Sequence, residues 1–583
     1  MPFKSRWSLT VPNVSLPSFM FGTPESEIND SEKLIIDAKR PETHYLTLYS
    51  YREWSKRFAA GLVEAGIQKG DRVMLFSGNG IFNPIVVLGT LMAGAIYNSA
   101  NPAYTPRELR HQLQDSQPRF VLAADNCIER ALEAADEIGY DKKNIFLFTE
   151  LPIQLDVNLS RTDRQHWGSL IADLDVGRQF AWQTFDSRAL AEQTAVLIYS
   201  SGTTGLPKGV ELSHRNIIAN MLQLEKIQLS DKTIKSRKCL CVVPLYHALG
   251  LGYYIFFAPR FGLKTYLMER YNLTDMLDHI QQFEITELVL VPPILVAMAK
   301  HPSVRDGTYN ITSVTKVVAG AAPIGMEVTT QFEELWNRKI LVRQAWGMSE
   351  LVAHGEFVLT LDDVITDHVT RAPAITLCWD ERSRIKDSSV SIGELVPGAE
   401  AKLMREDGTE EIRVGERGEF WIRTPNGMKG YWKNREATDE TLTSDGWLRT
   451  GDVAYRDEFN RWYMVDRIKE LIKVRGSQVA PAELEALLLE HPQIVDAAVI
   501  GIKTPTGDEN PRAYVVLAPR KPGSRSISEA DVVSFVSSRV SKTKHLTGGC
   551  VFIDAIPKNP SGKILRRQLR ELAAKDGELN AKL

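Results

Sequence analysis

Residues 199–210 read YSSGTTGLPKGV and form the stretch from which the rest of the chain can be interpreted. The stretch holds three glycines, two serines, two threonines and one lysine, Lys208. Glycines let backbone N–H groups turn toward an anion, while hydroxyls and a lysine add further donors and positive charge. Residues 195–199 just before it are apolar and β-prone. The stretch therefore predicts a phosphate-binding loop that follows a buried strand.

The spacing of this loop differs from that of the P-loop, in which a second glycine stands five places after the first and is followed by Lys-Ser/Thr. Here Pro207 stands five places after Gly202, and Lys208 is not followed by a hydroxyl residue. Ser213 predicts the N-cap of a helix through Asn220, so a short strand separates the loop from that helix. A merely flexible glycine-rich connection would explain the glycines but not the hydroxyls and the lysine.

The whole stretch resembles the phosphate-binding loop of the adenylate-forming enzymes, the superfamily of acyl-CoA synthetases, 4-coumarate:CoA ligases and firefly luciferase. Further motifs in the family's order extend the resemblance over residues 51–567, and GAAPIG at 320–325 is similar to the 4-coumarate:CoA-ligase-like branch. The resemblance implies that the loop binds the phosphates of ATP through Ser200, Ser201, Gly202, Thr203, Thr204, Gly205 and Lys208.

Length and composition indicate a globular protein of several units. A chain of 583 residues with 43% hydrophobic and 25% charged residues splits into two to four compact parts. A net charge of −3 gives no indication of a nucleic-acid partner, and five irregularly spaced cysteines indicate neither a disulfide framework nor a zinc site. We expect Cys239 and Cys241 to lie buried in a strand. The longest apolar stretch, 85–97, is shorter than the roughly eighteen residues of a membrane span, and the N-terminus lacks the apolar core of a signal peptide.

Alternating helix and strand patterns predict a layered α/β fold. Its expected elements are helices at 51–65 and 83–93 and strands at 72–76, 239–244, 288–293 and 314–320. Short alternating strands between 391 and 425, with a turn at Asp407-Gly408, predict a small β-subdomain. The last hundred or so residues predict an α+β unit with helices at 481–489 and 528–540 and strands at 497–502 and 513–517. Together with these patterns, the resemblance implies a large ATP- and carboxylate-binding domain over 1–466 and a smaller, mobile C-terminal domain over 467–583.

The nucleotide site is expected at three further segments. Small residues after the strand at 314–320 leave room for a flat ring, although they also pack tightly without any ligand. The segment QAWGMSE at 344–350 combines an aromatic face, a hydroxyl and a carboxylate. The resemblance places the adenine, phosphates, ribose and Mg²⁺ of the nucleotide at Gly320, Ala321, Ala322, Ala345, Trp346, Gly347, Ser349, Glu350 (Mg²⁺), Asp452 and Arg467 (ribose). Trp346 and Ser349 stand where the family usually has Tyr and Thr.

The carboxylic acid is expected beside the nucleotide. His247 alone would be interpreted as a packed or capping histidine, but the resemblance places it next to the substrate carboxylate. The expected pocket walls are His247, Gly320, Gly347 and Met348, with residues 351–354 as further candidates.

The segment 465–476 is charged and ends in glycine, which marks the domain boundary, and its alternating apolar residues predict a hairpin that starts the new unit. A lysine on a Pro/Gly-rich turn such as 557–563, PKNPSGK, is usually a solvated surface charge. The resemblance instead makes Lys563 the catalytic lysine and Lys469 the hinge about which the small domain turns. It also places Lys473, Arg475 and Gly476 on the face that serves CoA. The expected catalytic residues are Lys563, Lys473, Glu350 and Lys208.

The reaction implied by the resemblance is the ATP-dependent activation of an aryl or medium- to long-chain carboxylic acid to acyl-AMP, followed by transfer to CoA, with Mg²⁺ as the metal. The alternatives are a luciferase-like oxygenase and an adenylating enzyme that serves another acceptor. A peptide-synthetase module is disfavoured because only twenty residues follow Lys563, and an inert ATP-binding protein because Lys208, Glu350, Asp452 and Lys563 are all present.

The chain ends in Ala581-Lys582-Leu583, a conservative variant of the Ser-Lys-Leu signal for peroxisomal import. We therefore expect binding to the peroxisomal import receptor and a peroxisomal protein, with the cytoplasm as the alternative. A monomer and a homodimer both remain open.

Overall fold

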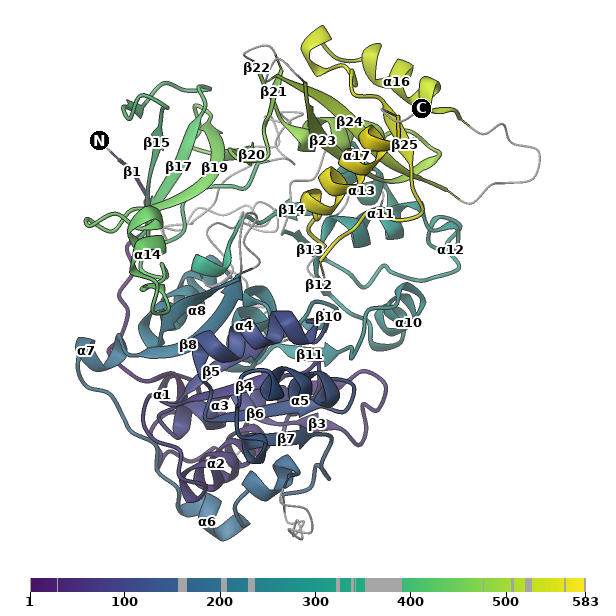
Figure 1. Cartoon of the computed structure of the whole chain (residues 1–583). Helices are drawn as coiled ribbons and strands as arrows, with labels where there is room; N and C mark the ends of the chain where they lie inside the picture. The colour runs from purple at the N-terminus through teal and green to yellow at the C-terminus, as the bar shows by residue number, and fades with distance from the viewer. Residues whose placement is uncertain are drawn as a thin grey trace, which may run out of the picture.

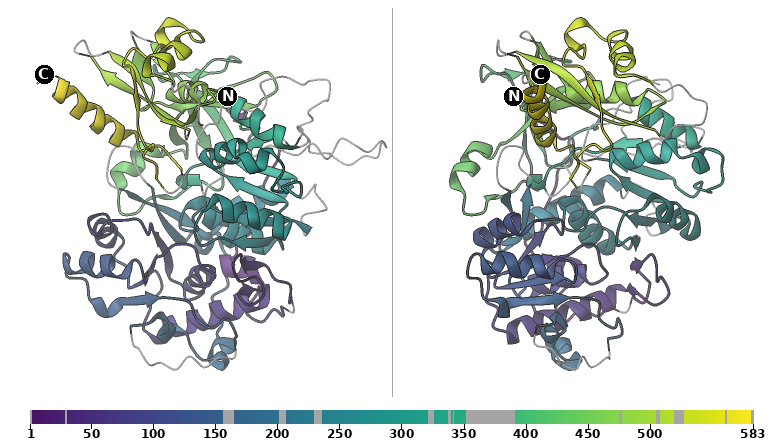
Figure 2. Two further views of the ribbon diagram at one scale, coloured as in Figure 1. Left: turned by 90° about the vertical axis from the view of Figure 1, so that its right-hand side faces the viewer. Right: turned by 45° about the vertical axis from the view of Figure 1, so that its right-hand side comes forward.

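The protein consists of a large domain, in which three β-sheets meet, and a smaller domain formed by the C-terminal residues (Figure 1). The computed structural model describes residues 2–28, 30–155, 165–200, 207–228, 236–320, 326–336, 340, 342–351, 391–474, 477–504, 508–518, 527–559 and 562–580. The small domain covers one end of the large one (Figure 2). At the same end the chain's first strand pairs with β15, residues Glu400–Met404 (Figure 1).

The first sheet has seven strands in the order β18-β9-β8-β5-β4-β6-β7, of which β5, β4, β6, β7 and β8 run parallel. Its strands are β4 (Arg72–Phe76), β5 (Ile96–Ala100), β6 (Phe120–Ala124), β7 (Ile145–Phe148), β8 (Thr194–Ser200), β9 (Lys208–Ser213) and β18 (Gly430–Tyr431). The helices between and around them are α1 (Leu16–Phe21), α2 (Leu48–Glu64), α3 (Asn83–Met92), α4 (Pro106–Ser116), α5 (Ile128–Asp136), α6 (Leu174–Gln179) and α7 (Arg188–Ala191). The apolar residues of β4, β5 and β8 are buried almost without interruption, as expected for parallel strands covered on both faces.

The second sheet also has seven strands, in the order β14-β13-β12-β10-β11-β2-β3, and all but β3 run parallel. Its strands are β2 (Ile35–Asp37), β3 (Tyr45–Leu46), β10 (Lys238–Cys241), β11 (Lys264–Leu267), β12 (Glu287–Leu290), β13 (Lys316–Ala319) and β14 (Val342–Gln344). The associated helices are α8 (His214–Gln228), the π-helix η4 (Gly250–Phe257), α9 (Ala258–Arg260), α10 (Leu273–Phe283), α11 (Pro292–Lys300), α12 (Pro302–Arg305) and α13 (Met326–Glu333). One buried hydrophobic cluster runs through both seven-stranded sheets and into the third.

The third sheet is antiparallel and closes the large domain. Its strands are β1 (Phe3–Lys4), β15 (Glu400–Met404), β16 (Glu410–Glu411), β17 (Gly418–Arg423), β19 (Leu448–Arg456) and β20 (Trp462–Arg467), with α14 (Arg435–Thr441) beside them. Alternate residues of β17 are buried, the pattern of a sheet with one solvated face.

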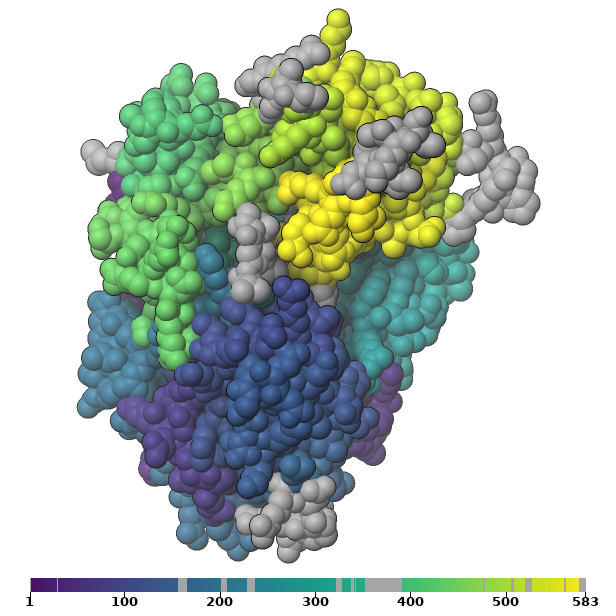
Figure 3. All heavy atoms as spheres, viewed as in Figure 1, coloured from purple at the N-terminus to yellow at the C-terminus, as the bar shows by residue number. Residues whose placement is uncertain are grey.

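The small domain has hydrophobic clusters of its own. Its elements are β21 (Ile472–Val474), β22 (Ser477–Val479), α15 (Pro481–Leu489), β23 (Ile494–Lys503), β24 (Glu509–Leu517), α16 (Glu529–Ser537), β25 (Cys550–Phe552) and α17 (Arg566–Asn580). In the space-filling view the yellow C-terminal atoms lie directly against the large domain (Figure 3).

The structure confirms the fold class that the sequence predicts. Each of the helices and strands predicted above has a counterpart, and Cys239 and Cys241 are buried in β10. Ser213 accepts a hydrogen bond from the N–H of Asn216 and caps α8, which continues to Gln228 rather than ending at Asn220. The boundary at 466/467 stays a prediction.

Residues 465–476 differ from the expected single hairpin. Val465 to Arg467 complete β20, which pairs with β19 in the third sheet, and only from Ile472 does a new hairpin, β21–β22, begin. Among the described residues, no helix combines the length and the apolar character needed to cross a bilayer.

Candidate active site

The two described ends of the predicted phosphate loop lie side by side. β8 and β9 are antiparallel, and Ser200 at the end of β8 is the register partner of Lys208 at the start of β9. Residues 201–205 lie outside the described residues. Lys208 carries the loop's positive charge to the face of Tyr431, whose ring centroid is 5.0 Å from the ammonium nitrogen.

Tyr431 connects this lysine to the predicted metal ligand. It lies on β18, which pairs with β9, and its hydroxyl donates a 2.8 Å hydrogen bond to Oε1 of the buried Glu350. Burial and, next, the Glu350 carboxylate hold the pKa of Tyr431 above its usual range, so its hydroxyl keeps its proton and donates at neutral pH. Tyr431 is not among the residues predicted from the sequence; its one signal there is its position as an aromatic residue after the turn-forming run PNGMKG at 425–430.

A second group of site residues forms where the third sheet meets the second. Asp452 and Arg467 are direct cross-strand partners on β19 and β20, and Nε of Arg467 lies 3.1 Å from Oδ1 of Asp452. The other carboxylate oxygen, Oδ2, accepts a 2.8 Å hydrogen bond from the indole nitrogen of Trp346. Asp452 is only 5% exposed. Both of its oxygens therefore already have protein partners at the place where the ribose is predicted.

Lys563 of the small domain belongs to this second group. Its loop is closed by reciprocal hydrogen bonds with Asn559, and Gly562 adopts φ +80°, where a Cβ would stand 3.2 Å from Cγ2 of Val291 in the large domain. The pKa of Lys563 is lowered to about 8, first by burial and next by Arg467, while Asp452 acts in the opposite direction. The structure thus brings together a lysine and a carboxylate that are more than a hundred residues apart in sequence.

The predicted adenine strip lies at the ends of two neighbouring strands. Gly320 follows β13, and a Cβ there would stand 3.0 Å from the carbonyl oxygen of Ala345, which follows β14. Gly347, Met348 and Ser349 continue the same segment and are partly exposed. Residues 321 and 322 lie outside the described residues.

His247 lies after β10, beside Tyr246, with their ring centroids 4.6 Å apart. Its Nε2 atom is buried and has no hydrogen-bond partner among the described residues, and burial lowers its pKa to about 4. A neutral ring with a buried, unpaired nitrogen suits a place beside a ligand. The backbone approaches itself closely here: a Cβ on Gly250 would stand 2.1 Å from the carbonyl oxygen of Pro244, so only glycine fits.

The predicted hinge and CoA residues lie farther along the chain. Lys469 is exposed on the turn between β20 and β21, and Lys473 is exposed on β21, where its N–H donates to Glu509. In the part of the chain that the structure describes, no contact joins the Lys473 side chain to the groups above. Arg475, Gly476 and residues 352–354 lie outside the described residues.

The donors around Glu350 fit a magnesium ion that is shared with phosphates. Mg²⁺ in nucleotide sites commonly takes one or two carboxylates and completes its shell with phosphate oxygens and water. Glu350 supplies one carboxylate next to the loop, and among the described residues no group of three or more His, Cys, Asp or Glu side chains is placed so that it could hold a metal ion. An all-protein metal cage is therefore not what these residues form.

A cavity of about 700 Å³ lies between the ends of β4, β6 and β7 and those of β2 and β11. None of the predicted site residues line it. Arg40, one of the basic residues that line this cavity, is already paired with Asp37 and Glu150. We therefore place the candidate active site at the groups described above and not in this cavity.

Two family models match the chain. Residues 29–432 match the model of the AMP-binding enzyme, and residues 483–563 match that of the AMP-binding enzyme C-terminal domain. The chain belongs to the AMP-binding enzyme family. It is an ATP-dependent, AMP-forming acyl-CoA ligase, and the resemblance seen in its motifs is confirmed.

Three relatives illustrate the range of the family. The phenylacetyl-CoA ligase epaB of Aspergillus niger is 34% identical over 98% of this chain and 99% of its own. The acyl-CoA ligase azaF of Aspergillus niger is 33% identical over 98% and 100%. The peroxisomal OPC-8:0-CoA ligase 1 of Arabidopsis thaliana is 36% identical over 89% and 87%.

Solved structures share the fold. The anthranilate CoA ligase AuaEII in complex with anthranoyl-AMP has a TM-score of 0.78, with 20% identity over 99% of both chains. ATP-bound MatB from Rhodopseudomonas palustris has a TM-score of 0.75, with 23% identity over 96% of this chain and 98% of its own.

Proposed function

We propose that this ligase makes acyl-AMP at the junction of its two domains and then forms the CoA thioester after the small domain has turned. The observation that carries the proposal is the position of Lys563: it comes from the small domain, is partly buried, and directly follows Gly562, which lies against Val291 of the large domain. Asp452 and Arg467 of the large domain both shift its pKa. A cation so placed can act on a nucleotide that the large domain holds.

In the first half-reaction a carboxylate oxygen attacks the α-phosphorus of ATP and pyrophosphate leaves. Both reactants are anionic, so positive charge at the α-phosphate and at the leaving group lowers the barrier. We assign Lys563 to the α-phosphate and Lys208, with the loop donors, to the departing phosphates. Mg²⁺ held by Glu350 would neutralise further phosphate charge when bound.

The ribose is assigned to Asp452 and Arg467, and the adenine to the strip that runs from Gly320 to Ser349. Because Trp346 holds one oxygen of Asp452 from the side of β14, the indole fixes the carboxylate toward the sugar. His247, neutral at physiological pH and with an unpaired nitrogen, is assigned to the wall of the acid pocket together with Met348.

In the second half-reaction the sulfur of CoA attacks the acyl carbon and AMP leaves. Lys563 fills space beside the α-phosphate that the thiol requires, so the small domain has to move. We assign the pivot to Lys469, exposed on its turn, and the face that then serves CoA to Lys473, Arg475 and Gly476.

The acid is proposed to be an aryl or a medium- to long-chain carboxylic acid. The relatives that cover nearly the whole chain support this class, since one is named a phenylacetyl-CoA ligase and another an acyl-CoA ligase. The experiment is a screen of pyrophosphate release, with and without CoA, over phenylpropanoid, phenylacetic and C6 to C18 fatty acids. CoA-dependent AMP release with one of these acids supports the proposal; oxygen consumption by the acyl-AMP, or release without any dependence on acid, contradicts it.

The site of action is proposed to be the peroxisome. The support is the terminal Ala581-Lys582-Leu583 and the name of one relative, a peroxisomal ligase. A fluorescent fusion at the N-terminus should collect in peroxisomes and disperse when Leu583 is deleted. An unchanged distribution after the deletion contradicts this proposal but leaves the chemistry untouched.

A further inference from the structure

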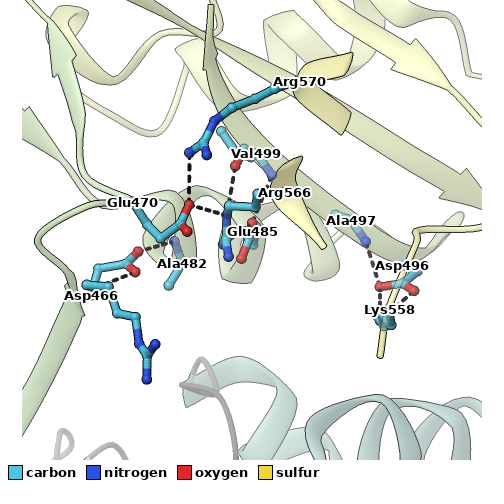
Figure 4. Close-up of polar contacts among 11 residues, drawn as sticks. Asp466, Glu470, Ala482, Glu485, Asp496, Ala497, Val499, Lys558, Arg566 and Arg570 are labelled. Carbon is cyan, nitrogen blue, oxygen red and sulfur yellow. Dashed lines mark hydrogen bonds and ion pairs between the residues drawn. The ribbon is translucent and has the colours of Figure 1, made fainter. Parts of the chain in front are cut away.

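The first helix of the small domain, α15, is held by the large domain at both of its ends. At the N-terminus, Oδ2 of Asp466 on β20 accepts a 3.1 Å hydrogen bond from the N–H of Ala482, while the N-cap residue, Ala480, makes no side-chain cap (Figure 4). At the C-terminus, the Nζ atom of Lys300, the last residue of α11, donates to the carbonyl oxygens of Leu489, at 3.2 Å, and Ile494, at 2.5 Å. A carboxylate at the start and an ammonium at the end match the dipole of the helix.

These two contacts cross a loosely packed interface. A cavity of about 400 Å³ lies between α11 and α15, lined mainly by apolar atoms of Pro293, Val296, Ala486 and Leu489. Side chains leave this space unfilled, so α11 and α15 make fewer apolar contacts with each other than two closely packed helices would. The polar contacts at the two ends of α15 therefore carry a large share of the orientation of the small domain.

The position of α15 is passed on to the catalytic loop by ion pairs inside the small domain. Glu485 of α15 accepts a 2.6 Å hydrogen bond from Arg566, three residues after Lys563. Glu470, just after the predicted hinge, accepts a 2.9 Å hydrogen bond from Arg570, and both arginines lie on α17 (Figure 4). A displacement of α15 thus displaces the base of the segment that presents Lys563.

We propose that Lys300 and Asp466 are positioning residues, which clamp α15 in the orientation that makes acyl-AMP and release it when the small domain turns to serve CoA. Both belong to the large domain: Lys300 lies on α11, and Asp466 precedes the predicted pivot at Lys469. Rotation about that pivot separates each of them from α15. The inference rests on the proposed alternation between the two half-reactions.

The test compares the two half-reactions in Lys300→Met, which keeps the length of the side chain and removes its donors. The first is exchange of labelled pyrophosphate into ATP in the presence of an acid substrate; the second is thiolysis of synthetic acyl-AMP by CoA. Lys300→Met removes the hydrogen bonds that this charged side chain donates across the interface, so the clamped orientation becomes less populated. We expect the exchange rate to fall about tenfold. Thiolysis should be unchanged or faster, because it does not need the clamped orientation. Lys300→Arg, which can still donate to both carbonyl groups, should recover most of the exchange rate.

The matched control is Lys544→Met. Lys544 pairs with Glu483, which lies on α15. Because both residues belong to the small domain, this variant should have the same rates as the unsubstituted enzyme in both assays. Asp466→Asn, which removes the charge at the other end of α15, should show the same one-sided loss as Lys300→Met. Equal losses in both half-reactions, or no loss in exchange, would overturn the clamp. An unsubstituted enzyme without any acid-dependent exchange would instead refute the proposed function.

Discussion

The pKa of Lys563 leads to a quantitative prediction for the rate of acyl-AMP formation. This pKa is lowered to about 8, mainly by burial, and only the charged lysine can stabilise the negative charge at the α-phosphate. Because the pKa is lowered, Lys563 loses its positive charge as the pH rises through about 8. About nine tenths of the free enzyme then carries the charge at pH 7 and about one tenth at pH 9, so kcat/KM for ATP should fall about tenfold between these two values. A lysine of ordinary pKa would lose only a few per cent of its charge over the same range.

The assay is pyrophosphate release at limiting ATP and saturating acid, from pH 6.5 to pH 9.5. The free-enzyme pKa is read from kcat/KM, whereas kcat reports the complex in which the phosphates of ATP raise it again. The control is Lys563→Arg, whose guanidinium stays charged throughout the range. Its residual activity, although lower, should be flat up to pH 9.5. A flat profile for the unsubstituted enzyme, or the same fall in both proteins, would refute the reasoning.

Two further predictions concern the large domain. In Tyr431→Phe the hydrogen bond to the buried Glu350 is lost, about 1 kcal/mol, so KM for ATP should rise several-fold while thiolysis of supplied acyl-AMP stays constant; an unchanged KM contradicts a role of Tyr431 in holding Glu350. Glu287 is 1% exposed and pairs with Lys316 at 3.2 Å and Arg237 at 3.3 Å. Glu287→Gln removes the negative charge that these two buried cations share and should cost about 3–5 kcal/mol, seen as a fall of several degrees in the melting temperature; a melting temperature within one degree of the original would contradict it.

Much of the fold follows from local pattern. The strand at 72–76 and the helix at 481–489 have the bounds that apolar spacing and the N-terminal Pro481 predict, because these segments obey one period and have clear ends. The break between β20 and β21 could not be predicted in this way. The alternating apolar residues of 465–476 fit a strand of the third sheet as well as a strand of the β21–β22 hairpin. Which sheet each half joins is decided by partners far away in the sequence.

The predicted site residues all lie in motifs, whereas the residues that contact them from distant parts of the chain do not. Asp452 and Arg467 could be named because their segments resemble those of a family, and the structure then pairs them. Tyr431 and Lys300 carry no such signal. Their partners lie 81 and up to 194 residues away, so only the folded chain shows what they touch.

The central claim is that Lys563, delivered by the small domain, serves one half-reaction and leaves before the other. The most direct measurement is to assay both half-reactions in Lys563→Ala. Acid-dependent exchange of labelled pyrophosphate into ATP should fall by at least about a hundredfold, as expected when a charge that stabilises the transition state is removed. Thiolysis of supplied acyl-AMP should stay within about twofold of the unsubstituted rate, since the thiol meets an acyl group that is already activated. Comparable losses in the two assays, or exchange that persists at its full rate, would contradict the account.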